Sequence, residues 1–307
     1  MSVFSNSETS KPAVTFQKPS QIKSWFFAFR PKTLLVSFSP IFAGSILAHK
    51  EYPYLFSIKY SLFAIFSALC IQIGTNLFND VLDFKKGTDN PNRLGPKRAT
   101  QNGWIAPRQV TRGALFFFVL AILFGIPLVV QGGIPILILG LVSLLCGYLY
   151  TGGPYPLAYK GLGELFVLLF FGFAATCGIF FIQTHLVTLA SVLAGAQIGF
   201  LACTLICINN FRDFENDKLC NKMTLSARFG KKFSRFEIAF FFFISYVIAV
   251  LQILENHQWN SLIVFAALPL AIKIVRYLRQ NEPNENLNQF LGMASVHQIL
   301  FTILFFR

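Results

Sequence analysis

The sequence predicts an all-α membrane protein, and three observations carry that prediction. First, 54% of the 307 residues are hydrophobic and only 13% are charged, whereas soluble domains carry about 25% charged residues. Second, apolar runs close to the roughly 20 residues that cross a bilayer recur along the chain. Third, the basic residues gather in alternate connecting segments. Because the bilayer core offers no water to unpaired backbone groups, we expect these runs to be helices.

Nine apolar runs are candidate spans, so we predict nine transmembrane helices. They lie at residues 33–49, 58–79, 114–131, 134–151, 162–182, 188–209, 235–254, 259–278 and 289–306. Residues 1–20 are polar and lack the apolar core of a secretory signal peptide, so we predict a disordered tail there. Residues 21–307 are predicted to form a single helical transmembrane domain.

The distribution of Lys and Arg predicts the topology. With the N-terminus in the cytoplasm, all of the 26 basic residues except Lys50, Lys59 and Arg307 fall in cytoplasmic segments or at cytoplasmic span ends. Short cytoplasmic loops of membrane proteins are enriched in Lys and Arg in this way. Topology therefore accounts for the net charge of +13, and we expect a lipid bilayer as partner and no nucleic acid.

All five aspartates of the chain fall in two short stretches, each at the inner end of a predicted span. The first stretch is TNLFNDVLDFKKGTDN, after the second span, and the other is INNFRDFENDK, after the sixth. Ionisable groups at membrane depth are costly and usually mark function. Interface charges paired with basic neighbours are the alternative, which suits one aspartate better than five in two matched motifs.

The spacing inside the two stretches is the same. Asn79 and Asp83 are four residues apart, which places them on one helix face about 6 Å apart along the axis, and Asp213 and Asp217 repeat that interval. Carboxylates repel unless a cation lies between them, and oxygen ligands without His or Cys suit Mg²⁺. The basic residues around both stretches favour a diphosphate as ligand. The matched positions also predict a weak internal repeat of four helices.

At these residues the chain resembles the UbiA superfamily of membrane prenyltransferases. Within it, the chain looks most like the MenA type, the 1,4-dihydroxy-2-naphthoate polyprenyltransferases of menaquinone synthesis. Four stretches carry the resemblance: RPKTLLVSFSPIFAGSILA (30–48), the first acidic motif with its following loop (76–98), YTGGPYPLAYKGLGE (150–164) and NNFRDFENDKLCNKMTL (209–225).

Two positions depart from the broader superfamily. Its first motif has a third acid where this chain has Gly87, with Asp89 two residues later, which is the MenA-like form. Its central loop has Tyr-x3-Lys, whereas Tyr155 is followed at that interval by Tyr159, and Lys160 comes one residue later. Because of this shift by one residue, the motif does not by itself assign the role of the family lysine to Lys160.

The resemblance implies a UbiA-like arrangement of nine helices around a central cavity that opens to lipid, with the polar motifs on the cytoplasmic side. It implies transfer of a polyprenyl chain from a polyprenyl diphosphate to an aromatic acid, 1,4-dihydroxy-2-naphthoate, with loss of carbon dioxide. Mg²⁺ is the implied cofactor, and the implied location is the bacterial cytoplasmic (inner) membrane.

The resemblance also implies roles for individual residues. The implied metal ligands are Asn79, Asp83, Asp213 and Asp217, assisted by Asp80 and Asp89. The implied diphosphate contacts are Arg93, Arg98, Arg212 and Lys222. The catalytic set is Asp83, Asp217, Asn79, Asp213, Tyr155 and Lys160. The substrate contacts are Asn76, Asn209, Asn210, Tyr148, Tyr150 and Tyr159.

Three alternatives remain open at this point. In the first, the protein is a prenyltransferase whose acceptor is 4-hydroxybenzoate, homogentisate or another naphthoate. In the second, the protein is a secondary transporter, which the spans, the repeat and the intramembrane acids would fit, although the acids lie at helix ends and not at the midplane. The third is a phosphatidyltransferase acting on CDP-alcohols, whose paired Asp-Gly motif is missing from this sequence.

Overall fold

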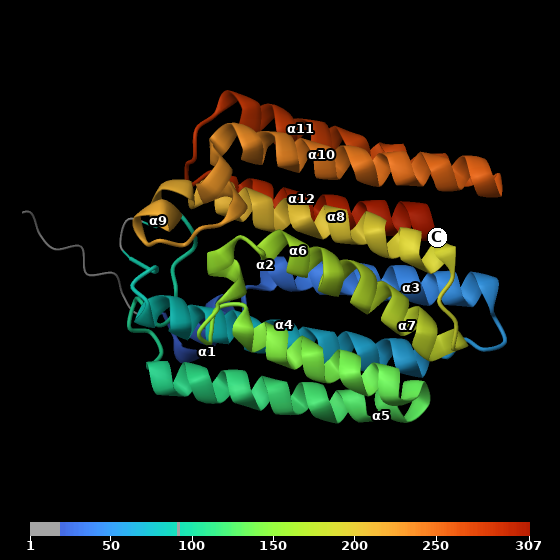
Figure 1. Ribbon diagram of the computed structural model, residues 1–307, viewed down its shortest axis with the longest axis horizontal. Helices are drawn as coiled ribbons and strands as arrows, with labels where there is room; N and C mark the ends of the chain where they lie inside the picture. The colour runs from blue at the N-terminus through green and yellow to red at the C-terminus, as the bar shows by residue number, and fades with distance from the viewer. Residues whose placement is uncertain (1–18, 91–92) are drawn as a thin grey trace, which may run out of the picture.

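The structure is a computed structural model that describes residues 19–90 and 93–307 (Figure 1). All regular structure in the described residues is helical, which confirms the predicted all-α class. In chain order the elements are α1 (Gln21–Phe29), α2 (Pro31–Leu34), η1 (Leu35–Ser37), α3 (Phe38–Glu51), α4 (Ile58–Lys85), α5 (Pro107–Leu149), η2 (Leu157–Lys160), α6 (Gly163–Val167), the π-helical η3 (Leu168–Ala174), α7 (Ala175–Thr184), α8 (Leu189–Arg212), α9 (Phe214–Leu219), α10 (Leu225–Asn256), η4 (Trp259–Ala267), α11 (Leu268–Gln280) and α12 (Leu287–Phe306).

The predicted tail falls almost wholly outside this description. Residues 1–18 lie outside the described residues. Ser20 already belongs to the fold, because its hydroxyl accepts a hydrogen bond from the amide of Lys23 at 3.4 Å and so caps α1.

Eight helical stretches of the described chain are long and apolar enough to cross a membrane, with α5 counted once. Its 43 residues correspond to about 64 Å at 1.5 Å per residue, twice the hydrocarbon thickness of about 30 Å. α5 reverses at Gly133, where φ is 67°, a conformation that favours glycine. A side chain on Gly147 in the second arm would press on the ring of Phe118 in the first, so the arms lie side by side (Figure 1). These arms correspond to the predicted spans 114–131 and 134–151, and nine crossings stay a prediction.

Two predicted spans end or bend differently from the expectation. α4 continues six residues beyond the predicted span 58–79, to Lys85, so the first acidic motif is helical. The predicted span 162–182 is divided into α6, η3 and α7. Gly172 in η3 packs directly on α8, where an added Cβ would lie 2.6 Å from the carbonyl oxygen of Gly195. Small residues permit such close helix contacts in membranes.

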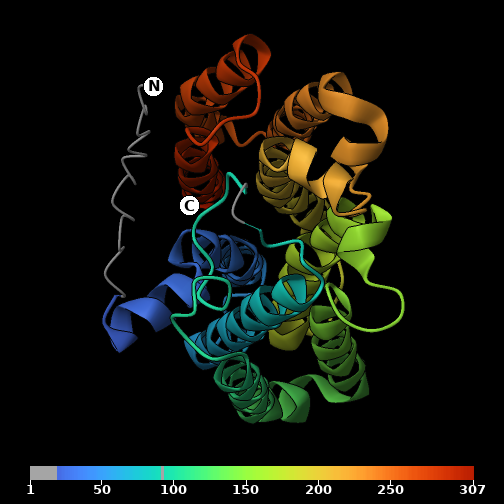
Figure 2. The same cartoon turned by 90° about the vertical axis from the view of Figure 1, so that its left-hand side faces the viewer.

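The helices differ in how deeply they are buried. α8 is central, with 72% of its most apolar window buried, whereas α5 has only 17% buried and therefore faces lipid. Between α3, α4, both arms of α5 and the segment α6–α7 lies a cavity of about 410 Å³. Figure 2 shows the end of the bundle where the loop after α4 crosses the helices and α9 packs beside it. Both acidic motifs lie at this end.

Candidate active site

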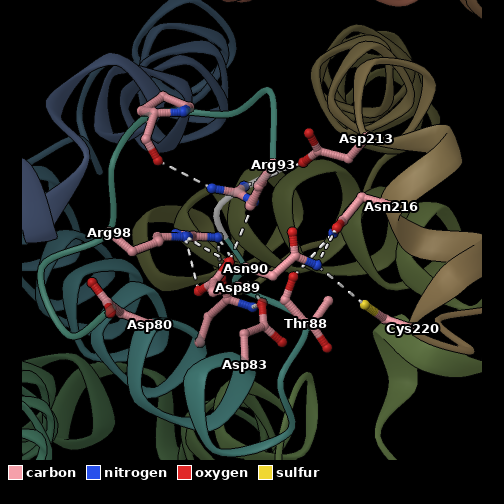
Figure 3. A network of polar contacts seen from close by, with 12 residues as sticks. Asp80, Asp83, Thr88, Asp89, Asn90, Arg93, Arg98, Asp213, Asn216 and Cys220 are labelled. Atoms are coloured by element: carbon pink, nitrogen blue, oxygen red, sulfur yellow. Dashed lines mark hydrogen bonds and ion pairs between the residues drawn. The ribbon is translucent and has the colours of Figure 1, made fainter. Parts of the chain in front are cut away.

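The two acidic motifs, far apart in sequence, meet in the structure (Figure 3). The Arg93 guanidinium, in the loop after α4, lies 3.2 Å from Oδ2 of Asp213, which follows α8. Asn216 in α9 joins the same two segments, because its Nδ2 donates to the carbonyl of Thr88 at 3.0 Å and its Oδ1 accepts from Asn90 at 2.5 Å. The ends of α4 and α8 therefore form one polar site.

Asn79 organises the first motif on α4. Its Nδ2 donates to Asp83 Oδ2 at 3.0 Å and to Thr151 Oγ1 at 2.8 Å. Its Oδ1 accepts from Arg98 Nη2 at 3.1 Å and from the guanidinium of Arg30. The side-chain oxygen of Asn79 is thus directed towards positive charge, and its amide nitrogen orients the Asp83 carboxylate.

Arg30 is a charged residue of the site that was not predicted from the sequence; the uncharged Thr88, Asn90, Thr151 and Asn216 were not predicted either. It connects α1 to α2 in a left-handed conformation with φ of 56°, which is uncommon for a residue other than glycine. This turn directs its guanidinium to Asn79 and to within 3.5 Å of the Asn76 carbonyl oxygen. In the sequence, Arg30 contributes to the positive charge of the predicted cytoplasmic tail, and the signal that marks it is its place at the start of the stretch RPKTLL.

Asp80 and Asp89 are already bound by protein groups. The two Asp80 oxygens accept from the backbone amides of Ala99 and Thr100, both at 3.1 Å, so Asp80 anchors the loop after α4. Asp89 lies 3.3 Å from Nε of Arg93 and 3.3 Å from Nε of Arg98. Burial raises the pKa of Asp89 to about 7, although Arg93 opposes this. Asp89 therefore holds two arginines in place at the mouth of the site.

Asp213 is the most heavily paired acid of the second motif. Arg212 binds it through two hydrogen bonds, Nε to Oδ1 at 2.9 Å and Nη2 to Oδ2 at 2.7 Å, and Arg93 adds a third contact. Burial alone would raise the pKa of Asp213, but the two arginines outweigh it and lower that pKa to about 2. Asp213 is therefore ionised and electrostatically compensated by protein cations.

Asp217, one helical turn later, has a different environment. Its only ion pair among the described residues is with Lys222, whose Nζ lies 3.7 Å from Oδ1. Oδ2 is buried and has no hydrogen-bond partner there. Burial raises the pKa of Asp217 to about 7, and the neighbouring charges of Asp213 and Asp83 add to this. A buried carboxylate oxygen without a partner is what a bound cation would satisfy.

Tyr159 occupies the place beside Asp83. Its hydroxyl donates to Asp83 Oδ1 at 2.8 Å and lies 2.6 Å from Thr88 Oγ1. The ammonium group of Lys86 lies 4.4 Å from the centre of the Tyr159 ring. Tyr159 thus links the central loop to the first acidic motif.

The other residues predicted in the central loop lie elsewhere. Tyr155 is 58% exposed, and the Nζ of Lys160, itself exposed, lies 4.9 Å from its ring. Tyr148 packs on Phe78 with ring centres 5.3 Å apart, and Tyr150 lines the apolar cavity. Of these predicted residues, only Tyr159 is hydrogen-bonded to an aspartate of the acidic motifs among the described residues.

The three predicted asparagine contacts are all engaged by neighbouring protein groups. Asn76 Nδ2 donates to the carbonyl of Phe29 at 3.0 Å. Asn209 Oδ1 accepts from Arg212 at 2.7 Å, and Asn210 Nδ2 donates to the buried Glu164 at 2.7 Å. In this structure these amides position the helices and arginines around the site.

The donor set fits Mg²⁺. Asp83 and Asp217 supply hard oxygen atoms from two helix ends, which is the chemistry that Mg²⁺ prefers, whereas the Asn79 oxygen already accepts from Arg98 and Arg30. The uncompensated Asp217 Oδ2 is the specific observation that favours a cation there. Magnesium usually binds one or two carboxylates together with substrate phosphates, and Arg93, Arg98 and Lys222 surround these carboxylates with positive charge.

The chain is similar to proteins of one family. Residues 37–296 match the UbiA prenyltransferase family. The chain is 33% identical to the 1,4-dihydroxy-2-naphthoate octaprenyltransferase of Bacillus subtilis (strain 168), over 92% of this chain and 90% of the relative. It is 35% identical to the enzyme of the same name from Escherichia coli (strain K12), over 88% of this chain and 90% of the relative.

Two solved structures share the fold. A UbiA homolog from Aeropyrum pernix K1 superposes with a TM-score of 0.70 at 13% identity, covering 90% of this chain and 97% of that chain. A UbiA homolog from Archaeoglobus fulgidus, in a structure bound to DMAPP and Mg²⁺, gives 0.65 at 16% identity, covering 92% and 98%. This multi-pass membrane protein, with its two converging acidic motifs, belongs to the UbiA prenyltransferase family.

Proposed function

We propose that this protein transfers a polyprenyl chain from an allylic polyprenyl diphosphate to 1,4-dihydroxy-2-naphthoate, with Mg²⁺, at the cytoplasmic face of the bacterial inner membrane. The observation that carries the proposal is the convergence of two acidic motifs, joined by Arg93 and Asp213 at 3.2 Å, at the polar end of a bundle with an apolar cavity. The names of the relatives at 33% and 35% identity support the naphthoate as acceptor.

The residues around the site divide the work of binding the diphosphate. Asp83 and Asp217 would hold Mg²⁺, which when bound neutralises charge that develops on the departing diphosphate. Asn79, predicted from the sequence as a ligand, would instead orient the Asp83 carboxylate. Arg93, Arg98 and Lys222 would contact phosphate oxygens directly. Asp89 and Asp213 fix the two arginines before substrate arrives, and such preorganised charge lowers the barrier because little reorganisation is needed during reaction.

The cavity supplies what the second half of the reaction needs. Breaking the allylic C–O bond leaves a carbocation, which water would capture. The cavity is lined mainly by apolar side chains and, among the described residues, by no charged one, so it excludes water from the cation. The ring of Tyr150 lines the cavity and offers π-electron density to a cation. A cavity wall without charge also favours this function over transport of ions at the membrane midplane.

The test is product formation by purified protein. We expect Mg²⁺, octaprenyl diphosphate and 1,4-dihydroxy-2-naphthoate to yield a prenylated and decarboxylated product, identified by mass. 4-Hydroxybenzoate and homogentisate, supplied in parallel, test the alternative acceptors. Turnover should stop with EDTA and in Asp217→Asn, and should persist in the matched variant Lys160→Ala. Absence of any prenylated product from all three acceptors would contradict the proposal.

A further inference from the structure

One face of α4 continues from the acidic site into the cavity. Asp83, Asn79 and Asn76 lie at intervals of three and four residues, and Gln72 continues the series. Gln72 lies about 10 Å deeper than Asn79, because a helix rises about 1.5 Å per residue. Thr75, one turn before Asn79 on the same helix, lies about 6 Å deeper than Asn79. Both residues line the cavity, just below the proposed diphosphate site.

Four polar side chains form what we call the inner polar band of this mainly apolar cavity. They are Ser37 from η1, Gln72 and Thr75 from α4, and Tyr150 after α5. Ser37 is only 3% exposed, and its Oγ has no hydrogen-bond partner in the part of the chain that the structure describes. Buried hydroxyl groups normally have a partner, and this hydroxyl lies in the cavity wall, where a ligand group could pair with it.

The two other serines of the cavity behave differently. Ser67 Oγ donates to the carbonyl of Ala121 at 3.0 Å, and Ser143 Oγ donates to the carbonyl of Leu139 at 2.7 Å. Both hydroxyls are satisfied by helix backbone. The inner polar band is therefore distinguished by chemistry as well as by its position near the acids.

We propose that the inner polar band binds the 4-hydroxyl group of the aromatic acceptor, an inference that rests on the proposed function. The Gln72 amide offers both donors and an acceptor, and the hydroxyls of Ser37 and Thr75 do the same, which suits a phenol group that also donates and accepts. The acceptor's carboxylate requires a cation, and the cavity wall has none among the described residues. The carboxylate therefore faces the basic residues at the polar end, and the 4-hydroxyl, which is not adjacent to the carboxylate on the ring, points inward.

Tyr150 completes the band as a donor. Its hydroxyl points towards the start of α6, where a Cβ on Gly163 would lie 3.4 Å from it. A tyrosine phenol keeps its proton at physiological pH, so this hydroxyl can donate. In this orientation the acceptor ring lies directly below the diphosphate, beside the first carbon of the prenyl chain.

The experiment compares two acceptors in matched variants. 1-Hydroxy-2-naphthoate lacks the 4-hydroxyl of 1,4-dihydroxy-2-naphthoate, and we expect wild type to bind it about tenfold or more weakly at equilibrium, because a hydrogen-bonding site rejects an analogue that leaves its groups unpaired. Gln72→Leu and Ser37→Ala should bind the dihydroxy acceptor about tenfold more weakly, and their dissociation constants for the two acceptors should differ by less than about threefold. The KM for the prenyl diphosphate should change by less than about twofold.

Ser67→Ala and Ser143→Ala are the controls, because they remove satisfied hydroxyls from the same cavity; they should discriminate like wild type. If Gln72→Leu and Ser37→Ala also discriminate like wild type, the inner polar band is not the acceptor site. Equilibrium binding of the fluorescent naphthoate provides a readout without turnover, and we expect about tenfold weaker binding in Gln72→Leu. If wild type binds the naphthoate about tenfold more tightly than Gln72→Leu but transfers no prenyl chain, only the proposed function is refuted. If wild type and Gln72→Leu bind the naphthoate equally well, the inner polar band is not the acceptor site.

Discussion

Asp213 and Asp217 lie one helical turn apart in the same motif, yet the structure treats them in opposite ways. Asp213 is held by Arg212 and Arg93, and these cations lower its pKa to about 2 against the effect of burial. Asp217 has one lysine at 3.7 Å and a buried oxygen without a partner, and burial raises its pKa to about 7. Equal spacing in the sequence therefore conceals unequal roles.

The difference separates structural charge from available charge. Asp213 holds Arg212 and Arg93 in place and so stabilises the contact between the two motifs. Asp217, like Asp83 across the site, keeps a carboxylate that a cation can still bind. A family motif read from sequence assigns both residues to the metal, whereas their partners predict that only one of them is free to bind it directly.

The largest expected effect is on turnover. We expect Asp217→Asn, and separately Asp83→Asn, to lower kcat at least about 1,000-fold, because each removes charge that stabilises the leaving diphosphate. Thermal unfolding in detergent should shift by no more than about 3 °C, since neither residue has a tight arginine partner. Turnover within tenfold of wild type in both variants would remove these residues from the site.

Asp213→Asn should act mainly on stability. The change leaves Arg212 and Arg93 buried without their carboxylate, and breaking such a buried pair costs about 3 kcal/mol or more. A thermal melt should therefore show a marked loss of stability that Asp217→Asn does not show. Equal melting temperatures for the two variants would contradict the division of roles.

Mg²⁺ itself should stabilise the protein through Asp217. At a concentration of 100 times its dissociation constant, a ligand that binds only the folded state adds about 2.7 kcal/mol. We expect wild type to melt at a higher temperature with Mg²⁺ than with EDTA. Asp217→Asn should lose this increase in melting temperature. An equal Mg²⁺ shift in wild type and Asp217→Asn would place the metal elsewhere.

The raised pKa of Asp217 predicts how Mg²⁺ binding depends on pH. Below about pH 7 the carboxyl group binds a proton, which must leave before the metal can bind. The Mg²⁺ concentration for half-maximal activity should therefore rise as pH falls, by up to about tenfold per pH unit for one competing proton. Without metal, the stability of the protein itself also depends on this proton. Because the folded state binds the proton more tightly than the unfolded state, the free energy of unfolding should fall as pH rises from about 4 towards 7. A half-saturating Mg²⁺ concentration that is constant from pH 8 to 6 would contradict this.

The smallest effects concern the central loop. Tyr159→Phe removes the hydrogen bond to Asp83 and should lower kcat about twofold to tenfold. Tyr155→Phe and Lys160→Ala should change kcat by less than about twofold, since both side chains lie on the exposed surface of the loop. Steady-state rates at saturating substrates make this comparison, and a larger loss in Tyr155→Phe than in Tyr159→Phe would reverse it.

The sequence predicted those features that follow from local patterns. Apolar runs identified the spans, and the four-residue interval placed Asn79 and Asp83 on one helix face. The contact between Arg93 and Asp213 was not predictable, because it joins segments 120 residues apart through a loop without regular structure. The contact of Arg30 with Asn79 was not predictable either, because it depends on a left-handed turn at Arg30. The division of the predicted span 162–182 at η3 depends on the packing of Gly172 against α8.

The most direct test of the central claim is binding of an unreactive prenyl thiolodiphosphate to the purified protein. If the two helix ends grip a metal-bound diphosphate, binding should require Mg²⁺, disappear with EDTA, and be lost in both Asp83→Asn and Asp217→Asn while Lys160→Ala binds normally. Binding of equal strength with Mg²⁺ and with EDTA, or undiminished binding in both aspartate variants, would contradict that claim.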